Sequence, residues 1–284
     1  MVNKNYVIRI LNSIVPLLVL LIIWEILSSL QILNPALFSR PTRIFGTIFN
    51  MLFIDLIPAP ISIPFVMDEV IVLYVGTLVF DIFSSLFRLS ISFILASVIG
   101  ILIGLVMGSS QYVHKFVDPI ITVLMPIPGI AWAPIFLVWL GFGDPTLLAV
   151  GFLAAIFPII QNVSAATTSI DQKMVWASQS MGANNHMVLT KVLIPHSFPF
   201  LLTGFKLGIA RAWRTIIAVE LIAGTLAGLG VMIFIAREFL QPYKIYGGII
   251  VLALIYFAIE LGIRQIEKRT IQKWGMVYVG ELYE

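Results

Sequence analysis

The chain has 284 residues, of which 60% are hydrophobic and only 11% are charged, and its mean hydropathy is +1.05. A typical soluble domain carries about 25% charged residues, and no water-soluble fold of this length could bury so much apolar surface. The absence of cysteine excludes disulfides, thiolate nucleophiles and Cys-ligated metals. The net charge of +3 fits basic cytoplasmic edges better than a nucleic-acid partner. We therefore expect an all-α integral membrane protein in the lipid bilayer, because its apolar runs are too long and too continuous for barrel strands.

Apolar runs separated by Gly, Pro and Ser clusters predict six spanning helices. They cover residues 11–30, 84–107, 119–140, 146–167, 197–223 and 244–264. The first run follows Lys4 and Arg9, as the core of a signal peptide would. It is about 20 residues long and lacks a small-residue cleavage site, so we interpret it as a retained span.

An even number of spans places both termini on the same side of the membrane. If that side is the cytoplasm, it holds nine of the 17 Lys and Arg residues, and four lie outside. The nine are Lys4, Arg9, Lys115, Lys173, Lys191, Arg264, Lys268, Arg269 and Lys273, and the four are Arg40, Arg43, Arg237 and Lys244. The positive-inside rule favours this orientation. We expect a multi-pass protein of the cell membrane with both termini in the cytoplasm.

The segment between the first two spans contains five prolines, which break any long helix because each lacks an amide donor and clashes with the preceding turn. They are Pro35, Pro41, Pro58, Pro60 and Pro64. Thr42–Ile57 is predicted to form an amphipathic helix on the outer membrane surface. Ile61–Phe80 is apolar enough for a seventh span, which would put the termini on opposite sides. Pro64 and the Asp68-Glu69 pair argue against that alternative.

A polar stretch between the fourth and fifth spans interrupts the apolar sequence. It reads DQKMVWASQSMGANNHMVLTKVLIP from Asp171 to Pro195, and nine residues separate Gly182 from Val192. It resembles the cytoplasmic loop of binding-protein-dependent ABC importer permeases, in which a short helix fits a groove in the ATPase subunit. The family pattern there is E-A-A, three residues, G, nine residues and I-x-L-P. Trp176-Ala177-Ser178 replaces E-A-A here, so the acidic residue expected to meet the ATPase is absent.

From about Pro35 to Trp274 the chain resembles the permease branch that serves nitrate, aliphatic sulfonate, taurine, bicarbonate and pyrimidine-precursor importers. Short motifs occur in the family order, whereas residues from about Met51 to Tyr74 resemble an insertion. The motifs are Trp24-Glu25, Phe38-Ser39-Arg40-Pro41, Ser85-Leu86-Phe87-Arg88, Gly100, Gly104, Gly108, Asp118-Pro119, Pro126-Ile127-Pro128, Ala133-Pro134, Trp139-Leu140-Gly141-Phe142-Gly143, Ala212-Trp213-Arg214, Ala218-Val219-Glu220 and Gly228-Leu229-Gly230. The three glycines at four-residue spacing also predict close helix packing.

The resemblance implies a type I ABC importer permease fold. Residues 1–83 would hold the first span and an extracytoplasmic loop, 84–267 the permease core with a coupling helix at about 171–190, and 268–284 a cytoplasmic tail. The chain would form a homodimer, bind two ABC ATPase subunits and receive solute from an extracytoplasmic binding protein. It would carry no cofactor, because ATP and magnesium would bind the ATPase. The residues expected to dock the ATPase are Trp176, Ala177, Ser178, Gly182, Ala183, Ile194 and Pro195.

Four ionisable residues lie in the predicted fifth span, where charges usually face a cavity or a partner. They are Lys206, Arg211, Arg214 and Glu220, and at 100° per residue the three basic ones fall within an arc of about 140°. One interpretation is a basic lining for an anionic solute such as sulfonate, taurine, nitrate or bicarbonate, with Glu220 paired to another helix. The other is interhelical pairing and snorkelling, above all for Lys206, with Arg214 as a structural partner of Glu220. The candidate pathway residues are Arg211, Trp213, Arg214 and Glu220.

Other functions have weaker sequence support. An ion-gradient-driven secondary transporter predicts repeated halves, but the first half has no convincing second copy of the Gly182–Pro195 pattern. A membrane-embedded enzyme is disfavoured because paired carboxylates, a P-loop and a nucleophile elbow are missing. His114, His186 and His196 lack metal-ligand spacing. We expect no catalytic or metal site, and an importer of a neutral heterocycle remains an alternative.

Overall fold

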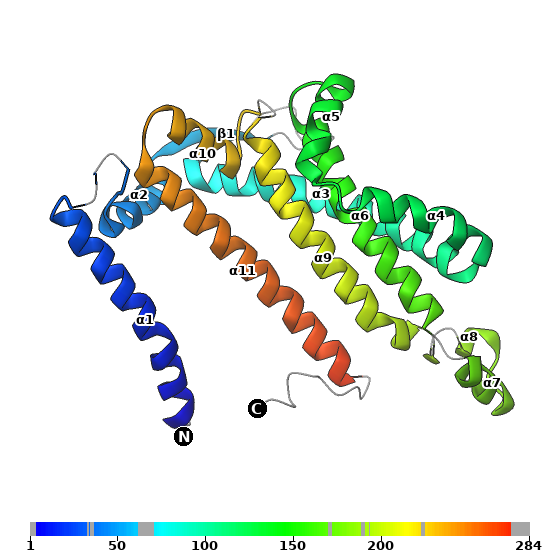
Figure 1. Cartoon of the computed structure of the whole chain (residues 1–284). Coiled ribbons are helices and arrows are strands. Elements are labelled where there is room, and N and C mark those ends of the chain that lie inside the picture. Colours follow the sequence, from blue (N-terminus) through cyan, green and yellow to red (C-terminus); the bar gives the residue numbers. More distant parts are fainter. Residues whose placement is uncertain are drawn as a thin grey trace. The chain divides into compact units, whose positions relative to one another are not determined.

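The computed structural model describes residues 4–32, 34, 37–61, 71–169, 172–188, 191–192, 194–222 and 225–273. Its helical elements are α1 (Lys4–Ser29), α2 (Pro41–Phe53), α3 (Thr77–Ser109), α4 (Gln111–Leu124), the 3-10 turn η1 (Gly129–Trp132), α5 (Ala133–Leu140), α6 (Asp144–Thr168), α7 (Gln172–Ser180), α8 (Asn185–Val188), α9 (Ile194–Glu220), α10 (Leu229–Glu238) and α11 (Pro242–Lys273) (Figure 1). The chain forms two compact units, one of residues 1–83 with 227–252 and one of residues 84–226 with 253–284.

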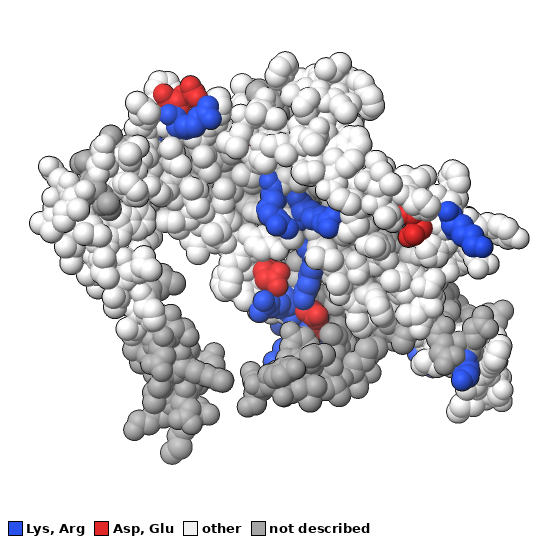
Figure 2. Space-filling model, in the orientation of Figure 1, with Lys and Arg blue, Asp and Glu red and all other residues white. Residues whose placement is uncertain are grey.

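Three helices in the described residues are long and apolar enough to cross a membrane: Thr77–Ser109, Asp144–Thr168 and Pro242–Thr270. A fourth crossing results if α4 and the η1–α5 segment, which bend by 94° at their junction, form one broken span. Most of the face in Figure 2 carries no charged side chain. α1 and α9 have comparable lengths of 26 and 27 residues. Six spans remain a prediction.

The expected single helix over 119–140 is wrong, because the chain breaks between α4 and η1. Pro126 and Pro128 lie in the break. Each removes an amide donor and disfavours helical geometry in the residue before it.

The start of α3 also differs from the prediction, since α3 begins at Thr77, before the predicted start at Ser84. A serine pair does not stop a helix whose hydroxyls find partners, and Ser85 Oγ donates to Glu220 Oε1 at 2.8 Å.

In the first unit, α2 is the amphipathic helix predicted over Thr42–Ile57, although it ends at Phe53. Ile44 and Met51 are buried on one side, while phenylalanines are exposed on the other. Glu25 of α1 stabilises the first turn of α2. Its Oε2 accepts a hydrogen bond from Thr42 N and its Oε1 accepts one from Thr42 Oγ1, both at 3.0 Å. This carboxylate satisfies an amide that the helix start would leave unpaired.

A two-stranded hairpin, which the sequence does not predict, follows α2 in this otherwise helical fold. Strands β1 (Leu56–Ile61) and β2 (Ile71–Gly76) pair antiparallel, with Leu56 opposite Gly76 and Ile61 opposite Ile71. Pro58 and Pro60, two residues apart, turn their missing donors to the same edge, which an edge strand tolerates. The strand at 71–76 excludes a seventh spanning helix over Ile61–Phe80. Asp68 and Glu69 lie outside the described residues.

The core of the second unit is built around α6, which packs against both α3 and α9. The glycines predicted to permit close packing, Gly100, Gly104 and Gly108, face Ile159, Val163 and Thr167 of α6. A Cβ on Gly104 would lie 2.6 Å from Val163 Cβ and 2.9 Å from the Ile160 carbonyl oxygen. The small-residue pattern is therefore confirmed as a contact between two helices.

Candidate translocation site and coupling helices

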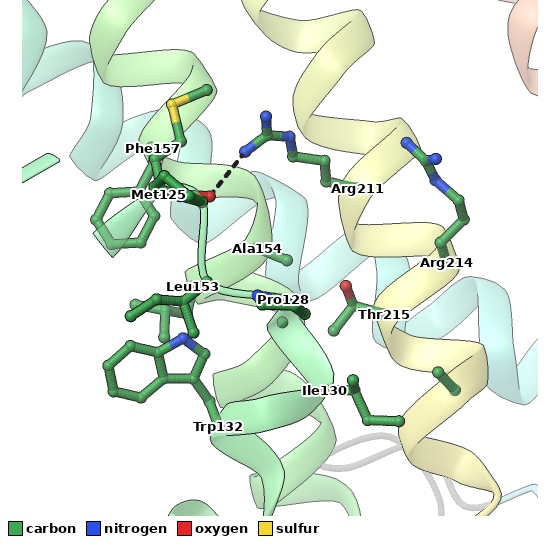
Figure 3. Close-up of a pocket in the computed structure, with 14 residues that line it drawn as sticks. Met125, Pro128, Ile130, Trp132, Leu153, Ala154, Phe157, Arg211, Arg214 and Thr215 are labelled. Atoms are coloured by element: carbon green, nitrogen blue, oxygen red, sulfur yellow. Dashed lines mark hydrogen bonds between the residues drawn. The ribbon is translucent and has the colours of Figure 1, made fainter. Parts of the chain in front are cut away.

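A cavity of about 390 Å³ lies in the second unit, where the chain breaks between α4 and η1 (Figure 3). Residues between 125 and 132 form the wall at the break, and α6 and α9 form the others. The lining residues of α6 are Leu153, Ala154 and Phe157, and those of α9 are Arg211, Arg214, Thr215 and Ala218. The bend exposes backbone at this wall, since a broken helix leaves carbonyl groups without helical partners.

Arg211 and Arg214 place two positive charges on the α9 wall. Arg211 Nη1 donates to the Met125 carbonyl oxygen at 3.4 Å, across the cavity in Figure 3, and Arg214 Nε donates to the Ala210 carbonyl oxygen of its own helix at 3.0 Å. Arg211 is half-buried and Arg214 is exposed. In the described part of the chain neither guanidinium has a carboxylate partner. The cavity therefore carries net positive charge on one wall.

The rest of the wall is largely apolar. Figure 3 shows Trp132, Leu153 and Phe157 across the cavity from the α9 arginines. A cavity with guanidinium donors on one side and aromatic and aliphatic groups on the other can orient a small organic anion.

Glu220 does not line this cavity, because it is buried in an ion cluster that joins three helices. Arg88 Nη1 of α3 donates to Glu220 Oε1 at 2.7 Å, and Arg88 Nε donates to Asp144 Oδ1 of α6 at 2.7 Å. The side chains of Arg88 and Glu220 are only 6% and 0% exposed. The expected pairing of Glu220 with another helix is confirmed, and the alternative pairing with Arg214 is wrong.

Arg88, Ser85 and Asp144 were not recognised as functional candidates from the sequence. One signal was available: Arg88 is an ionisable residue in an apolar run, and Ser85 lies three residues earlier on the same helix face. Trp213 is also outside the cavity, and it is buried with 4% exposure.

Lys206 forms an ion pair with Glu267 of α11 in the second unit. The interpretation of Lys206 as an interhelical partner is therefore confirmed. Lys206 is absent from the residues that line the cavity, which leaves Arg211 and Arg214 as its basic groups.

The segment predicted as one coupling helix over about 171–190 is two short helices, α7 and α8. The first ends at a C-terminal cap in which Gly182 adopts φ +86°. Gly182 N donates to Gln179 O at 2.9 Å and Ala183 N to Ser178 O at 3.0 Å, the pattern of a Schellman motif. Asn184 then starts α8, because its Oδ1 accepts a hydrogen bond from Met187 N at 2.8 Å. Gly182 thus turns the chain between the two helices.

Apolar side chains are exposed on α7 and at its junction with α8. Trp176 is 60% exposed and Met181 is 88% exposed. Ser178, Gly182 and Ala183 line a shallow cavity of about 260 Å³ with Met181 and Met187. Ala177 is exposed beside Trp176. The side chains of Ile194 and Pro195, also expected at the docking surface, lie outside the described residues.

Sequence similarity agrees with this architecture. Residues 96–272 match the family model described as binding-protein-dependent transport system inner membrane component. The chain is 34% identical to the taurine transport system permease protein TauC of Escherichia coli over 265 residues, 93% of this chain and 90% of that protein. It is 29% identical over 224 residues to the putative aliphatic sulfonates transport permease protein SsuC of Bacillus subtilis, covering 79% and 80% of the two chains. The nitrate import permease protein NrtB of Synechocystis is 33% identical over 179 residues, 63% of each chain.

A solved structure supports the fold. A chain from an inward-facing crystal form of the MetNI methionine ABC transporter superposes with a TM-score of 0.56 at 19% identity, over 68% of this chain and 96% of that chain. At this identity the likeness concerns the fold alone.

Fold and similarity together define the permease component of an ABC transporter, a non-catalytic membrane subunit. The chain belongs to the family of inner-membrane components of binding-protein-dependent transport systems. It is thus a multi-pass inner-membrane protein, and a system of this kind includes an ATPase and a solute-binding protein. Membership in this family excludes the secondary-transporter interpretation.

Proposed function

We propose that this permease imports a small anionic solute and that the α9 arginines contact the solute during transport. The observation that carries the proposal is the cavity at the α4–η1 break, where Arg211 and Arg214 lack carboxylate partners among the described residues. The names of similar permeases, which refer to taurine, aliphatic sulfonates and nitrate, support an oxyanion. Sulfonate, taurine, nitrate and bicarbonate are the candidate solutes. A neutral heterocycle such as a pyrimidine precursor fits less well, because it would leave both charges without a counter-ion.

Guanidinium groups suit this task because their planar donors match the geometry of an oxyanion. Binding must remain weak enough for release, as in any conduction pathway. Arg214 meets that condition, since it is exposed and water can screen its charge. Arg211 is half-buried and donates to the Met125 carbonyl oxygen, so its guanidinium is less accessible to water than that of Arg214.

The test is transport by Arg214→Gln in liposomes that contain the permease, its ATPase and its binding protein. We expect taurine or sulfonate uptake to fall on the order of tenfold, which corresponds to about 1.4 kcal/mol of lost interaction. Arg214→Lys should retain more uptake because it keeps the charge. Solute binding to the external protein and assembly with the ATPase should not change. Uptake equal to wild type in Arg214→Gln would rule out the pathway role.

The proposal includes docking of the ATPase on α7 and α8. Trp176 of α7 and Met181 at the junction of the two helices are exposed apolar side chains in an otherwise polar segment, which is typical of an interaction site. ATP and magnesium would bind the ATPase subunits, two per transporter. Closure of those subunits would move α7 and α8 and, through the chain that leads into α9, the cavity wall.

We further propose that two copies of the chain form the transporter, with six spans each and both termini in the cytoplasm. Small residues such as Gly204 and Gly208 of α9 could allow two copies to pack closely. They do not support this dimer, because they face Asn162 and Ile159 of α6 in the same chain. The support comes from Arg214, since an exposed charge on a spanning helix requires water or protein in place of lipid. A second copy of the chain would cover the cavity on the side where Arg214 is exposed. Native mass spectrometry of the intact transporter should find two identical permease chains, and a second, different permease would contradict the homodimer.

A further inference from the structure

Two adjacent cavities in the first unit belong to no part of the proposed transport site. One is polar, has a volume of about 510 Å³ and is lined by Ser28, Ser39, Thr42, Arg40 and Arg43 among others. The second is an apolar groove of about 380 Å³ along α1, lined by Leu20, Ile23, Trp24 and Leu27 with Tyr246. Phe38 lines both cavities, so they adjoin each other. A polar compartment joined to an apolar groove fits a ligand with both kinds of surface.

The polar cavity carries a net positive charge. Arg40 Nη2 donates to the Ser29 carbonyl oxygen at 3.5 Å, and the Arg43 guanidinium lies 4.2 Å from the centre of the Tyr243 ring. Neither arginine pairs with a carboxylate in the part of the chain that the structure describes. Glu25 contributes one negative charge at the edge, where both its oxygens accept hydrogen bonds from Thr42. Two arginines and one glutamate leave one positive charge, which matches the single negative charge of a phosphodiester.

Two buried polar groups on α1 also lack partners. Ser28 lines the polar cavity and Trp24 lines the groove, and their buried atoms Oγ and Nε1 have no hydrogen-bond partner in the described structure. Buried polar atoms nearly always have one, so each points to a group that the protein alone does not supply. The two residues are one helical turn apart, about 6 Å along the axis. That separation is similar to the distance between the phosphate and an acyl ester of a glycerophospholipid.

The neighbouring elements suit a membrane interface. Phe45, Phe49 and Phe53 are exposed along one side of α2, which begins at the polar cavity. An amphipathic helix with such a face lies at the boundary between headgroups and acyl chains. Trp24, Tyr243 and Tyr246 surround the site, and such aromatic residues concentrate at this depth.

We propose that these two cavities together bind one glycerophospholipid. Its phosphodiester lies between Arg40 and Arg43 with Ser28 beside it, and an acyl chain follows Leu27, Trp24, Ile23 and Leu20 along α1. The bound lipid ties α1 to α2. This site is separate from the solute pathway and does not depend on the proposed function.

The experiment is native mass spectrometry of the intact transporter, purified in detergent and titrated with dioleoylphosphatidylglycerol. We expect Arg40→Gln/Arg43→Gln to weaken lipid binding at least tenfold, because each guanidinium contributes charge-assisted hydrogen bonds to the phosphate. Arg237→Gln is the matched control, since Arg237 is an exposed arginine of the same unit that pairs with Glu238. Leu27→Trp, which fills the groove and leaves both arginines, should also weaken binding. Arg40→Gln alone should reduce affinity without loss of fold, because the 3.5 Å contact with Ser29 is weak.

Three outcomes would overturn the proposal. The first is lipid binding by the double variant or by Leu27→Trp at wild-type affinity. The second is competition by sn-glycerol 1-phosphate or inorganic phosphate at the same concentration as the lipid, which would indicate a simple anion site. The third is equal binding of dioleoylglycerol, which has no phosphate and would indicate a non-specific apolar groove. Thermal unfolding of each variant in detergent establishes that it is folded.

Discussion

At the scale of single residues, the Arg88–Glu220 ion pair is a buried contact between two helices of the second unit. Both side chains are almost fully buried, so Arg88→Met takes away the guanidinium that pairs with the Glu220 carboxylate, whereas after Glu220→Met the Arg88 guanidinium still pairs with Asp144. Arg88→Met should lower the free energy of unfolding by about 3–5 kcal/mol, and Glu220→Met should lower it by less. The double variant should recover much of that loss, because apolar replacement of both partners removes the unpaired charge. Thermal unfolding of the four proteins in detergent measures the effect, and additive losses would contradict it.

The sequence predicted part of this residue-level arrangement. Glu220 was expected to pair with another helix because an isolated carboxylate is too unfavourable in an apolar segment. Its partner was not predicted, since Arg88 is 132 residues away along the chain. Arg211 and Arg214 were placed on one helix face by the helical period. Their cavity could not be foreseen, because it depends on a break in a different span.

At the scale of elements, the contact between α3 and α6 depends on small residues. Gly104→Leu should lower the free energy of unfolding by about 1–3 kcal/mol or more, because the added side chain meets Val163 and the Ile160 carbonyl oxygen. Gly262→Ala on α11 is the matched control. A Cβ there has nothing within 4 Å, so the substitution should be neutral or slightly stabilising. Equal melting temperatures for Gly104→Leu and wild type in detergent would refute the packing argument.

The junction of α7 and α8 gives a second prediction at this scale. Gly182→Trp should abolish co-purification of the ATPase, because a large side chain would project into the open space beside Gly182. Gly182→Asn should preserve most of it, since asparagine tolerates the left-handed conformation at a helix end. Membrane insertion of both variants should be normal. If Trp and Asn have the same effect, the loss reflects backbone strain and not an obstructed docking surface.

The sequence predicts well those elements that have a strong periodic or small-residue signal. It predicts less well those elements whose geometry depends on where prolines lie. The spacing of the α3 glycines predicts both that two helices contact each other and that their backbones approach closely. The length and hydropathy of the run over 119–140 predict one helix, and they do not reveal the break that occurs at Pro126 and Pro128. In the first unit, prolines were interpreted only as helix breakers, although β1 accommodates two of them at a sheet edge.

At the scale of the whole molecule, the absence of cysteine allows the orientation to be tested directly. Leu240→Cys and Met181→Cys place single thiols at positions that are 85% and 88% exposed. In intact cells an impermeant maleimide should label Leu240→Cys and leave Met181→Cys unlabelled. Permeabilised cells should label both. The reverse pattern would place α7 and α8 outside the cell and exclude an ATPase partner there.

The break between α4 and η1 also determines how much water reaches this part of the second unit. An unpaired carbonyl group is too unfavourable in hydrocarbon for lipid to cover such a break. The break must therefore be hydrated or covered by protein, and a cavity with a charged wall favours hydration. Water admitted there would raise the local dielectric constant and, if Arg214 contacts the solute as proposed, would weaken its hold on an anion. On the proposed pathway, the same interruption that forms the cavity wall would keep the residence time of the solute short, whereas a continuous helix would leave a drier site from which an anion would escape slowly.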